Sequence, residues 1–337
     1  MRKIRVIQYG TWVCTHADHI ALSMRSMPDI YELVGVCEPN DEYRARAESA
    51  QAYEGVRWMT LDEVLSEKDI DAIIVETHEL EQGKDALFFV QRGYNVHMDK
   101  PGGEDKEVFE QLVKTAKEKN VVFHTGYMYR YNPGIVKTLE IIKSGLLGDV
   151  IFTEMNMNAY YSKFLLDWLG EFKGGMMFYL GCHLTDLMYL LQGKPNKIEV
   201  LNTSSGLHQS TSKDSGFVLF HYDRGVSFAK TVACETDGYK RRQLVVVGTN
   251  GVIEIRPIED PMIHETITNA NMVTVQLRYR QENSVKEEEF TFGPYGRYDD
   301  MMIDFAEMVA GEKTSPFTPD YELEVYKLIR KTCELED

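Results

Sequence analysis

The chain has 337 residues, enough for two domains with a core in each. Hydrophobic residues make up 43% and charged residues 27%, which is ordinary for a globular protein. With 37 basic and 53 acidic residues, the formal net charge is -16. Such a surface repels phosphate backbones and anionic lipid, so we expect neither nucleic acid nor a membrane as a partner.

The N-terminal segment and the cysteines bear on the compartment. The opening segment MRKIRVIQYG enters a short apolar run and lacks the features of a signal peptide. No apolar run approaches the roughly 20 residues of a membrane span. The five cysteines are scattered, and no two form a CxxC pair, which indicates reduced thiols. We therefore expect a cytoplasmic protein.

The first third of the chain alternates strand-like and helix-like segments. Helices are predicted up to about residue 27, over 41–53 and over 61–67, between strands predicted at 4–8, 32–37, 72–76, 95–98 and 121–125. This order is typical of a doubly wound parallel sheet with helices on both faces. The fold class is therefore α/β, and we predict a Rossmann domain over residues 1–125.

From about residue 126 the pattern changes. A helix over 134–144 and a strand over 150–158 precede a helix predicted to begin near Gly175. Further strands are predicted at 197–202, 216–222, 226–234, 242–247, 251–255, 273–279 and 287–292, followed by helices at 298–310 and 321–333. Such runs predict an α+β domain with a large, mostly antiparallel open sheet over residues 126–337. Its last helix is a candidate to pack back on the first domain.

The loop after the first predicted strand is the candidate nucleotide-binding turn. Rossmann domains carry glycines here, so that the pyrophosphate can approach the backbone at a helix N-terminus. In this chain the GxGxxG motif falls on QYGTWV and keeps only the middle glycine, Gly10. The loop is therefore either a nucleotide site with an eroded motif or an ordinary turn.

Glu38 ends the second predicted strand. A carboxylate at this position can accept both ribose hydroxyls of NAD, and it would repel the extra phosphate of NADP. The alternative is a solvated acid at a strand end. The pattern favours NAD as cofactor over NADP.

Five further motifs follow in order along the chain. They are HMDKPGG at 97–103, GYMYRYNP at 126–133, Trp168 before Gly174-Gly175, GCHLTDLMYLLQG at 181–193 and GTNGVIEI at 248–255. In these motifs the chain resembles the Gfo/Idh/MocA oxidoreductases, the family of glucose-fructose oxidoreductase and inositol dehydrogenase. The resemblance covers essentially the whole chain. Asp99 stands where family members have the glutamate of Glu-Lys-Pro.

The resemblance implies an NAD-dependent oxidoreductase that interconverts a ring hydroxyl and a ketone on a sugar, sugar derivative, glycoside or cyclitol. Lys100 would orient the hydroxyl or share its proton, because it lies at the strand edge where open α/β sheets place their ligands. The implied cofactor-binding residues are Gly10, Thr11, Trp12, Glu38, Thr77, His78, Asp99 and Lys100.

His183 is the second candidate for proton transfer, since an imidazole exchanges protons near neutral pH. Tyr179 and Asp186 lie about one turn to either side on the predicted helix, so the three share a face. Many family members have an aspartate where this chain has Tyr179. The tyrosine either relays a proton to His183 or packs as an aromatic ring. Asp186 either contacts a substrate hydroxyl or anchors the helix.

Substrate recognition is assigned by the resemblance to segments that line the cleft in similar proteins. Arg130 equally suits a salt bridge at the domain junction. Cys14, His16 and His19 lie close together, but their spacing is not that of a zinc site, so no metal is expected. The substrate-binding candidates are Tyr127, Arg130, Tyr160, Trp168 and Asp186, with Asn158 and Lys173 as weaker members.

A second hypothesis is a non-catalytic regulator of the same fold that responds to a sugar or a nucleotide and binds another protein. The missing glycines and the missing aspartate suit it, whereas the presence of both Lys100 and His183 favours an enzyme. The resemblance also implies a homodimer or homotetramer, formed through the outer face of the second sheet.

Overall fold

The structure is a computed structural model that describes residues 2–259 and 271–335. It divides into two compact units. Unit 1 comprises Met1–Met128 and Tyr298–Glu324, and unit 2 comprises Tyr129–Arg297 and Val325–Asp337. The second division falls within helix α11 (Pro319–Thr332), so this helix contributes to both units.

Unit 1 is built on a parallel sheet. In the described part of this unit the sheet has five strands in the order β2-β1-β3-β4-β5. The strand order reverses beside β1, and open α/β sheets bind their ligands at such a switch point. The predicted doubly wound parallel sheet is confirmed. The strands are β1 (Ile4–Tyr9), β2 (Tyr31–Cys37), β3 (Ala72–Val75), β4 (Asn95–Met98) and β5 (Phe123–Thr125).

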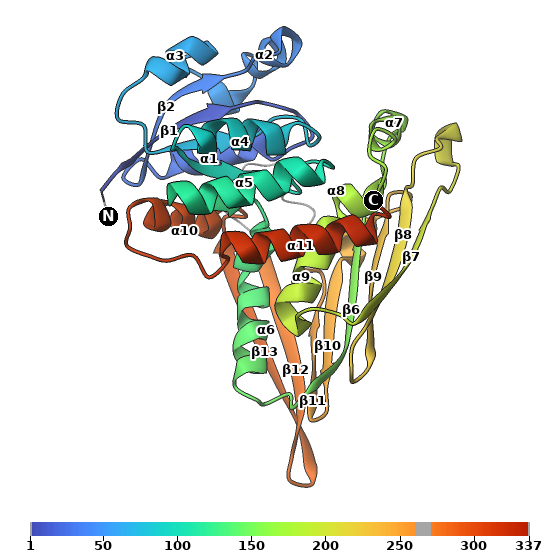
Figure 1. The fold of residues 1–337 in the computed structure, drawn as a ribbon. Helices are drawn as coiled ribbons and strands as arrows, with labels where there is room; N and C mark the ends of the chain where they lie inside the picture. Colours follow the sequence, from blue (N-terminus) through green and yellow to red (C-terminus); the bar gives the residue numbers. More distant parts are fainter. Residues whose placement is uncertain (1, 260–270, 336–337) are drawn as a thin grey trace. The chain divides into compact units, whose positions relative to one another are not determined.

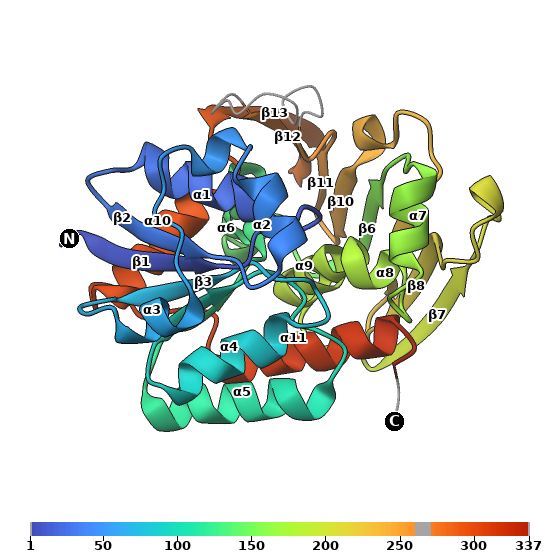
Figure 2. The ribbon, with the colours of Figure 1, turned by 90° about the horizontal axis from the view of Figure 1, so that it is seen from above.

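Helices cover both faces of this sheet. Figure 2 shows α4 (Gln82–Gln91) and α5 (Lys106–Lys119) side by side along one face, and α1 (Ala17–Ser26) on the other. Two shorter helices, α2 (Asp41–Ala47) and α3 (Leu61–Ser66), lie in the connection from β2 to β3.

Residues 298–324 belong to unit 1, whereas the sequence-based boundary placed them in the second domain. The reason is the packing of α10 (Asp299–Val309) on α1. The Ser23 hydroxyl donates to Asp299 at 2.6 Å, and the Tyr31 hydroxyl donates to the backbone oxygen of Met302 at 2.6 Å. These contacts join α10 to α1 and β2, which lie more than 270 residues earlier in the chain.

Unit 2 is built on a larger sheet. Its described residues form eight strands in the order β13-β12-β11-β10-β6-β9-β8-β7. All neighbours are antiparallel except β6 and β9, which run parallel. The predicted large, mostly antiparallel sheet is confirmed. The strands are β6 (Val150–Asn158), β7 (Lys197–Thr203), β8 (Ser215–His221), β9 (Val226–Val232), β10 (Gln243–Gly248), β11 (Gly251–Ile255), β12 (Asn271–Gln281) and β13 (Ser284–Tyr295).

The helices of unit 2 pack against one face of its sheet. Figure 1 shows α6 (Pro133–Lys143) and α9 (Gly181–Gln192) lying along this face. α8 (Met176–Tyr179) contacts β8 and β9 on the same face, and α7 (Lys163–Leu169) follows β6. The inward side chains recur at every second position, as a pleated strand requires, and are fully buried; they include Met155, Val218, Ala229, Leu244, Ile253 and Val275. None of the described helices has the length and apolar character needed to cross a bilayer.

Candidate functional site

Gly10 opens the loop between β1 and α1. Its φ of +94° lies in the region that favours glycine. A Cβ atom at this position would lie 2.5 Å from the backbone nitrogen of Thr77, so no side chain fits. The one glycine that the eroded motif retains is therefore required by the close approach of the loop to the segment after β3.

Glu38 ties this loop to the end of β2. One carboxylate oxygen accepts from the backbone nitrogen of Thr11 at 2.6 Å and from its hydroxyl at 3.0 Å. The other oxygen accepts from the backbone nitrogen of Asn40 at 2.8 Å. Glu38 is only 7% exposed, so it is not a solvated strand-end acid. Since a carboxylate offers about four acceptor positions, it retains capacity for a ribose hydroxyl.

Trp12 brings the loop together with the segment after β3. Its ring centroid lies 4.5 Å from that of Tyr43 and 5.1 Å from that of His78. Its indole N–H donates to Glu79 at 3.0 Å. Trp12 of the loop thus contacts His78, another predicted cofactor residue. Both follow the carboxyl ends of their strands, β1 and β3, which is where a Rossmann sheet binds a dinucleotide. Thr77 donates its hydroxyl to Asp85 at 2.7 Å.

Asp99 and Lys100 follow β4, and each is only 1% exposed. The Asp99 carboxylate lies 3.0 Å from the Nδ1 atom of His16. Burial alone would raise the pKa of Asp99, but His16 and Lys100 hold that pKa at about 2. A Cβ atom at Gly126 would come within 2.8 Å of the same carboxylate, so this glycine makes room for it. Asp99 is thus a fixed anion beside Lys100.

Two further acids, which no sequence motif indicated, interact with the charge of Lys100. Glu76 directly follows β3, and Glu79 lies three residues later; both are fully buried. Burial raises the pKa of Glu79 to about 8 and the pKa of Glu76 well above its ordinary value, while the charge of Lys100 acts to lower both. The available signal was an acid at the carboxyl end of the wholly apolar run AIIV.

Glu76 is also close to a buried pair of histidines, His97 and His124. The Nδ1 atoms of His97 and His124 are 2.7 Å apart, and both rings pack against Phe305. The Nε2 atom of His97 lies 3.9 Å from Glu76. Because burial lowers the pKa of His97 to about 4, this ring is neutral at neutral pH and supplies no charge to Glu76.

In unit 2, His183 lies on α9 and is 2% exposed. Its ring meets that of Tyr129 edge to face, with centroids 5.0 Å apart. Tyr179 ends α8, so the single helix predicted from Gly175 onward is in fact two helices. They meet at Leu180, whose φ of -105° is far from the helical value, and Gly181 follows with its poor helix propensity.

The Tyr179 ring packs against Trp168, with centroids 4.6 Å apart and planes 82° apart. Trp168 is 4% exposed, and its indole N–H has no hydrogen-bond partner among the described residues. Asn158 is fully buried, and within the described ranges neither atom of its side-chain amide has a partner. Buried polar groups of this kind suit the hydroxyls of a ligand.

The remaining substrate candidates differ widely in burial. Tyr127 is 2% exposed and belongs to unit 1, whereas Tyr160, in unit 2, is 51% exposed with its ring centroid 6.4 Å from that of His208. Lys173 is exposed.

Arg130 and Asp186, two of the predicted substrate residues, bind each other. The Arg130 Nε atom lies 3.0 Å from the carboxylate and Nη2 lies 2.6 Å from it, and both side chains are fully buried or nearly so. This bidentate geometry anchors α9 to the segment before α6. Arg130 and Asp186 both belong to unit 2, so this salt bridge lies inside that unit.

A second buried ion cluster surrounds Glu259. Its carboxylate accepts hydrogen bonds from the Tyr129 hydroxyl, from Arg242 and from Arg297, the last at 2.8 Å. Glu259 and Arg242 are each 2% exposed. No sequence motif indicated this cluster, because Tyr129 and Glu259 are 130 residues apart.

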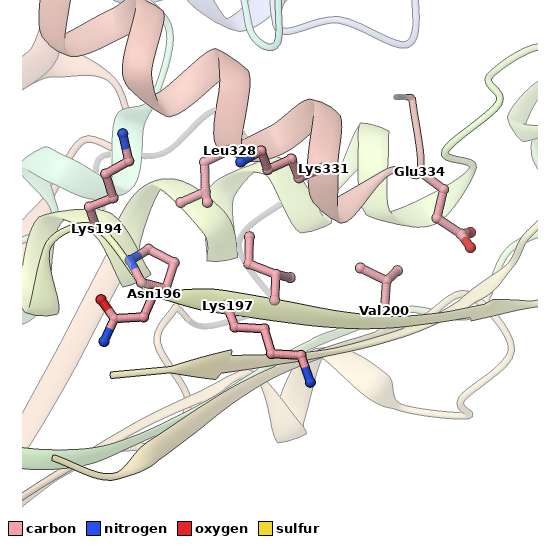
Figure 3. Close-up of a pocket in the computed structure, with 9 residues that line it drawn as sticks. Lys194, Asn196, Lys197, Val200, Leu328, Lys331 and Glu334 are labelled. Atoms are coloured by element: carbon pink, nitrogen blue, oxygen red, sulfur yellow. The ribbon is translucent and has the colours of Figure 1, made fainter. Parts of the chain in front are cut away.

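One open hollow of unit 2, about 570 Å³ in volume, lies between β7 and the end of α11. Figure 3 shows the side chains of Lys194, Lys197 and Lys331 pointing in different directions around it, so they form no common anion cradle. None of its lining residues is a predicted site residue. Within the described ranges, no group of three His, Cys, Asp or Glu side chains is arranged to hold a metal ion.

Comparison with known proteins places both parts of the chain in one family. Residues 6–127 match the profile "Oxidoreductase family, NAD-binding Rossmann fold", and residues 135–254 match the profile "GFO/IDH/MocA C-terminal domain". An uncharacterized oxidoreductase of Streptococcus pneumoniae is 26% identical over 169 residues, which cover 48% of this chain and 46% of that protein. The chain spans about half the length of the curated relatives it matches.

Two solved structures share the fold across nearly the whole chain. A putative NADPH-dependent oxidoreductase from Desulfitobacterium hafniense has a TM-score of 0.83 at 14% identity, covering 99% of this chain and 95% of that one. UDP-N-acetylglucosamine 3-dehydrogenase from Acidithiobacillus ferrooxidans has a TM-score of 0.77 at 17% identity, covering 99% and 98%. At these identities the likeness shows the fold alone.

Proposed function

The chain belongs to the Gfo/Idh/MocA oxidoreductase family, and we propose that it interconverts a ring hydroxyl and a ketone on a sugar, sugar derivative, glycoside or cyclitol. The observation that carries this proposal is Lys100, a lysine 1% exposed at the carboxyl end of a central parallel strand. Burying a cation is costly, and a fold retains it where the charge or the proton is used.

The residues at the switch point of unit 1 fit a dinucleotide. Gly10 lets the loop after β1 approach the segment after β3, and Glu38 presents a carboxylate at the end of β2 for the ribose hydroxyls. The negative charge of Glu38 favours NAD over NADP. Bound NAD would take the hydride that leaves the carbinol carbon.

Lys100 and His183 divide the handling of the proton. Lys100 orients the substrate hydroxyl and shares its proton, while the negative charge of the neighbouring Asp99 favours the protonated lysine. His183, buried on α9, shuttles the proton. Tyr179 and Trp168, packed edge to face, offer an aromatic surface to the ring of the substrate.

The assembly is proposed to be a homodimer or homotetramer in the cytoplasm. The face of the unit 2 sheet opposite its helices carries partly exposed aromatic rings. Phe228 lies between Phe152 and Phe217, with ring centroids 5.8 Å and 5.3 Å away. A second copy covering this face would bury these rings.

Nucleotide binding is tested first by thermal shift on protein stripped of bound nucleotide, with NAD+, NADH and NADP+. A ligand that binds only the folded state stabilises it by about 2.7 kcal/mol at a hundredfold excess over Kd. We expect a clear rise in Tm with NAD+ or NADH and a smaller one with NADP+. An unchanged Tm with all three nucleotides would contradict the proposal.

Turnover is then measured with a panel of cyclic polyols and the matching ketones. Lys100→Met should lower kcat by about 10²–10⁴-fold while the fold and NAD+ binding persist. Lys114→Met, which removes an exposed lysine of α5, is the matched control and should behave as wild type. Binding of NAD+ without turnover of any substrate would favour the alternative hypothesis, a non-catalytic regulator of the same fold.

A further inference from the structure

Three carboxyl groups meet around Lys100 inside unit 1. Asp99 has its partner in His16. Glu79 accepts one hydrogen bond, from Trp12, and its second oxygen has no partner within the described ranges. Neither oxygen of Glu76 makes a hydrogen bond of ordinary geometry to a described residue. Glu76 and Glu79, which we name the acid pair, are therefore poorly satisfied although fully buried.

The charges that face the acid pair do not balance two carboxylates. Lys100 supplies the cation, while His16 is engaged by Asp99. Thr15 and Trp12 contribute neutral donors, and His97 is neutral. A buried carboxylate without hydrogen bonds costs several kcal/mol, and such a group takes up a proton instead. In the ligand-free protein the acid pair therefore holds at least one proton at neutral pH.

The position of the acid pair relates it to the cofactor. In a Rossmann sheet the adenosine ribose meets the acid at the end of β2, and the dinucleotide crosses the switch point beside β1. Its nicotinamide half therefore lies toward the ends of β3 and β4, where Glu76, Glu79 and Lys100 lie. The oxidised nicotinamide ring carries a positive charge, and the reduced ring carries none.

We propose that the acid pair releases a proton to solvent when the oxidised cofactor binds, and so distinguishes NAD+ from NADH. This inference rests on the proposed function. When a carboxyl of the acid pair ionises, its negative charge stabilises the positively charged nicotinamide ring of NAD+. The nicotinamide ring of NADH is neutral, so ionisation does not stabilise it. By linkage, affinity for NAD+ rises with pH by up to tenfold per pH unit below pH 8, and affinity for NADH stays nearly constant.

The test is isothermal titration calorimetry of the full chain at pH 7, with NAD+ and NADH each titrated in two buffers of different ionisation enthalpy. The buffer dependence of the heat gives the number of protons released. We expect about one proton per NAD+ and almost none per NADH. Glu79→Gln and Glu76→Gln should each reduce the release with NAD+. Glu81→Gln removes an exposed acid that pairs with Lys84 at 3.0 Å, and it should leave the release unchanged.

The variants also separate the acid pair from Lys100 as the source of the proton. If Lys100 released it, Lys100→Met would abolish the release and both glutamine variants would keep it, which would overturn the inference. Equal proton counts for NAD+ and NADH would overturn it as well, and would leave the proposed function intact. Failure of both nucleotides to bind would overturn the proposed function and the inference together. Should Glu76→Gln not fold, Glu79→Gln alone decides, since Glu79 accepts only one side-chain hydrogen bond.

Discussion

Glu259 in unit 2 accepts hydrogen bonds from a tyrosine and two arginines, whereas Glu76 in unit 1 accepts none of ordinary geometry from the described residues. Both side chains are almost fully buried. Buried ions that are fully paired rigidify a scaffold, whereas a buried carboxyl without partners responds to a ligand that supplies the missing charge. The contrast fits an architectural role for unit 2's ion clusters and the response to the cofactor that we propose for unit 1's acid pair.

The largest expected effect comes from breaking a paired cluster. Asp186→Asn leaves the guanidinium of Arg130 buried beside a neutral amide, so the free energy of unfolding should fall by about 3–5 kcal/mol. Chemical denaturation measures it. The double variant Arg130→Met with Asp186→Leu should recover part of the loss, because it buries no charge. Asp167→Asn, which breaks an exposed pair with Lys163, is the control and should cause no measurable change. A loss below about 1 kcal/mol for Asp186→Asn would contradict the structural assignment.

The acid pair should show the opposite behaviour. The folded pKa of Glu79, about 8, exceeds the ordinary value of 4.5, so between these values the folded chain binds a proton that the unfolded chain has lost. The stability that Glu79 contributes is therefore lost as pH rises through this window. Glu79→Gln cannot ionise and should be more stable than wild type by about 1–3 kcal/mol at pH 9, with the difference vanishing below pH 4.5. The stability of Glu81→Gln should differ from that of wild type by the same amount at every pH. The same behaviour in Glu79→Gln would show that the Glu79 carboxylate has the hydrogen bonds and charge partners it needs.

A smaller effect is expected at Glu38. Glu38→Gln removes the charge but keeps a side chain that can still accept from Thr11. Binding of NAD+ should weaken about tenfold, or ~1.4 kcal/mol, and the discrimination against NADP+ should shrink. Titration calorimetry with both nucleotides measures this. Glu42→Gln, an exposed acid at the start of α2, should bind both as wild type does. Unchanged selectivity in Glu38→Gln would remove Glu38 from the cofactor site.

The elements were predictable where the sequence signal is local. The strands at 95–98 and 150–158 are confirmed to the residue, because local turn signals mark where they begin: Gly93 precedes the first, and the turn Gly145–Gly148 precedes the second. The division between α8 and α9 was missed, since the helical spacing of apolar residues continues across Leu180. Residues 298–324 were placed in the second domain because no periodicity shows which sheet a helix packs on.

The residues of the candidate site were also predictable only where a local sequence signal marks them. Gly10, Glu38 and Lys100 could be selected because each follows a strand inside a recognisable motif. The role of the acid pair could not be predicted, because only the structure shows that three of its four carboxylate oxygens have no hydrogen-bond partner among the described residues. The ion cluster around Glu259 joins residues up to 168 positions apart, so only the folded structure brings it together.

The most direct measurement of the central claim follows hydride transfer at the site beside Lys100. Cyclic polyols deuterated on their ring carbons are mixed with the protein and NAD+, and the reduced nucleotide is analysed by mass spectrometry. We expect transfer of a single deuterium from at least one polyol by the wild type, and transfer at least about a hundredfold slower by Lys100→Met. Binding of NAD+ without label from any polyol, together with no transfer from deuterated NADH to the matching ketones, would contradict the claim.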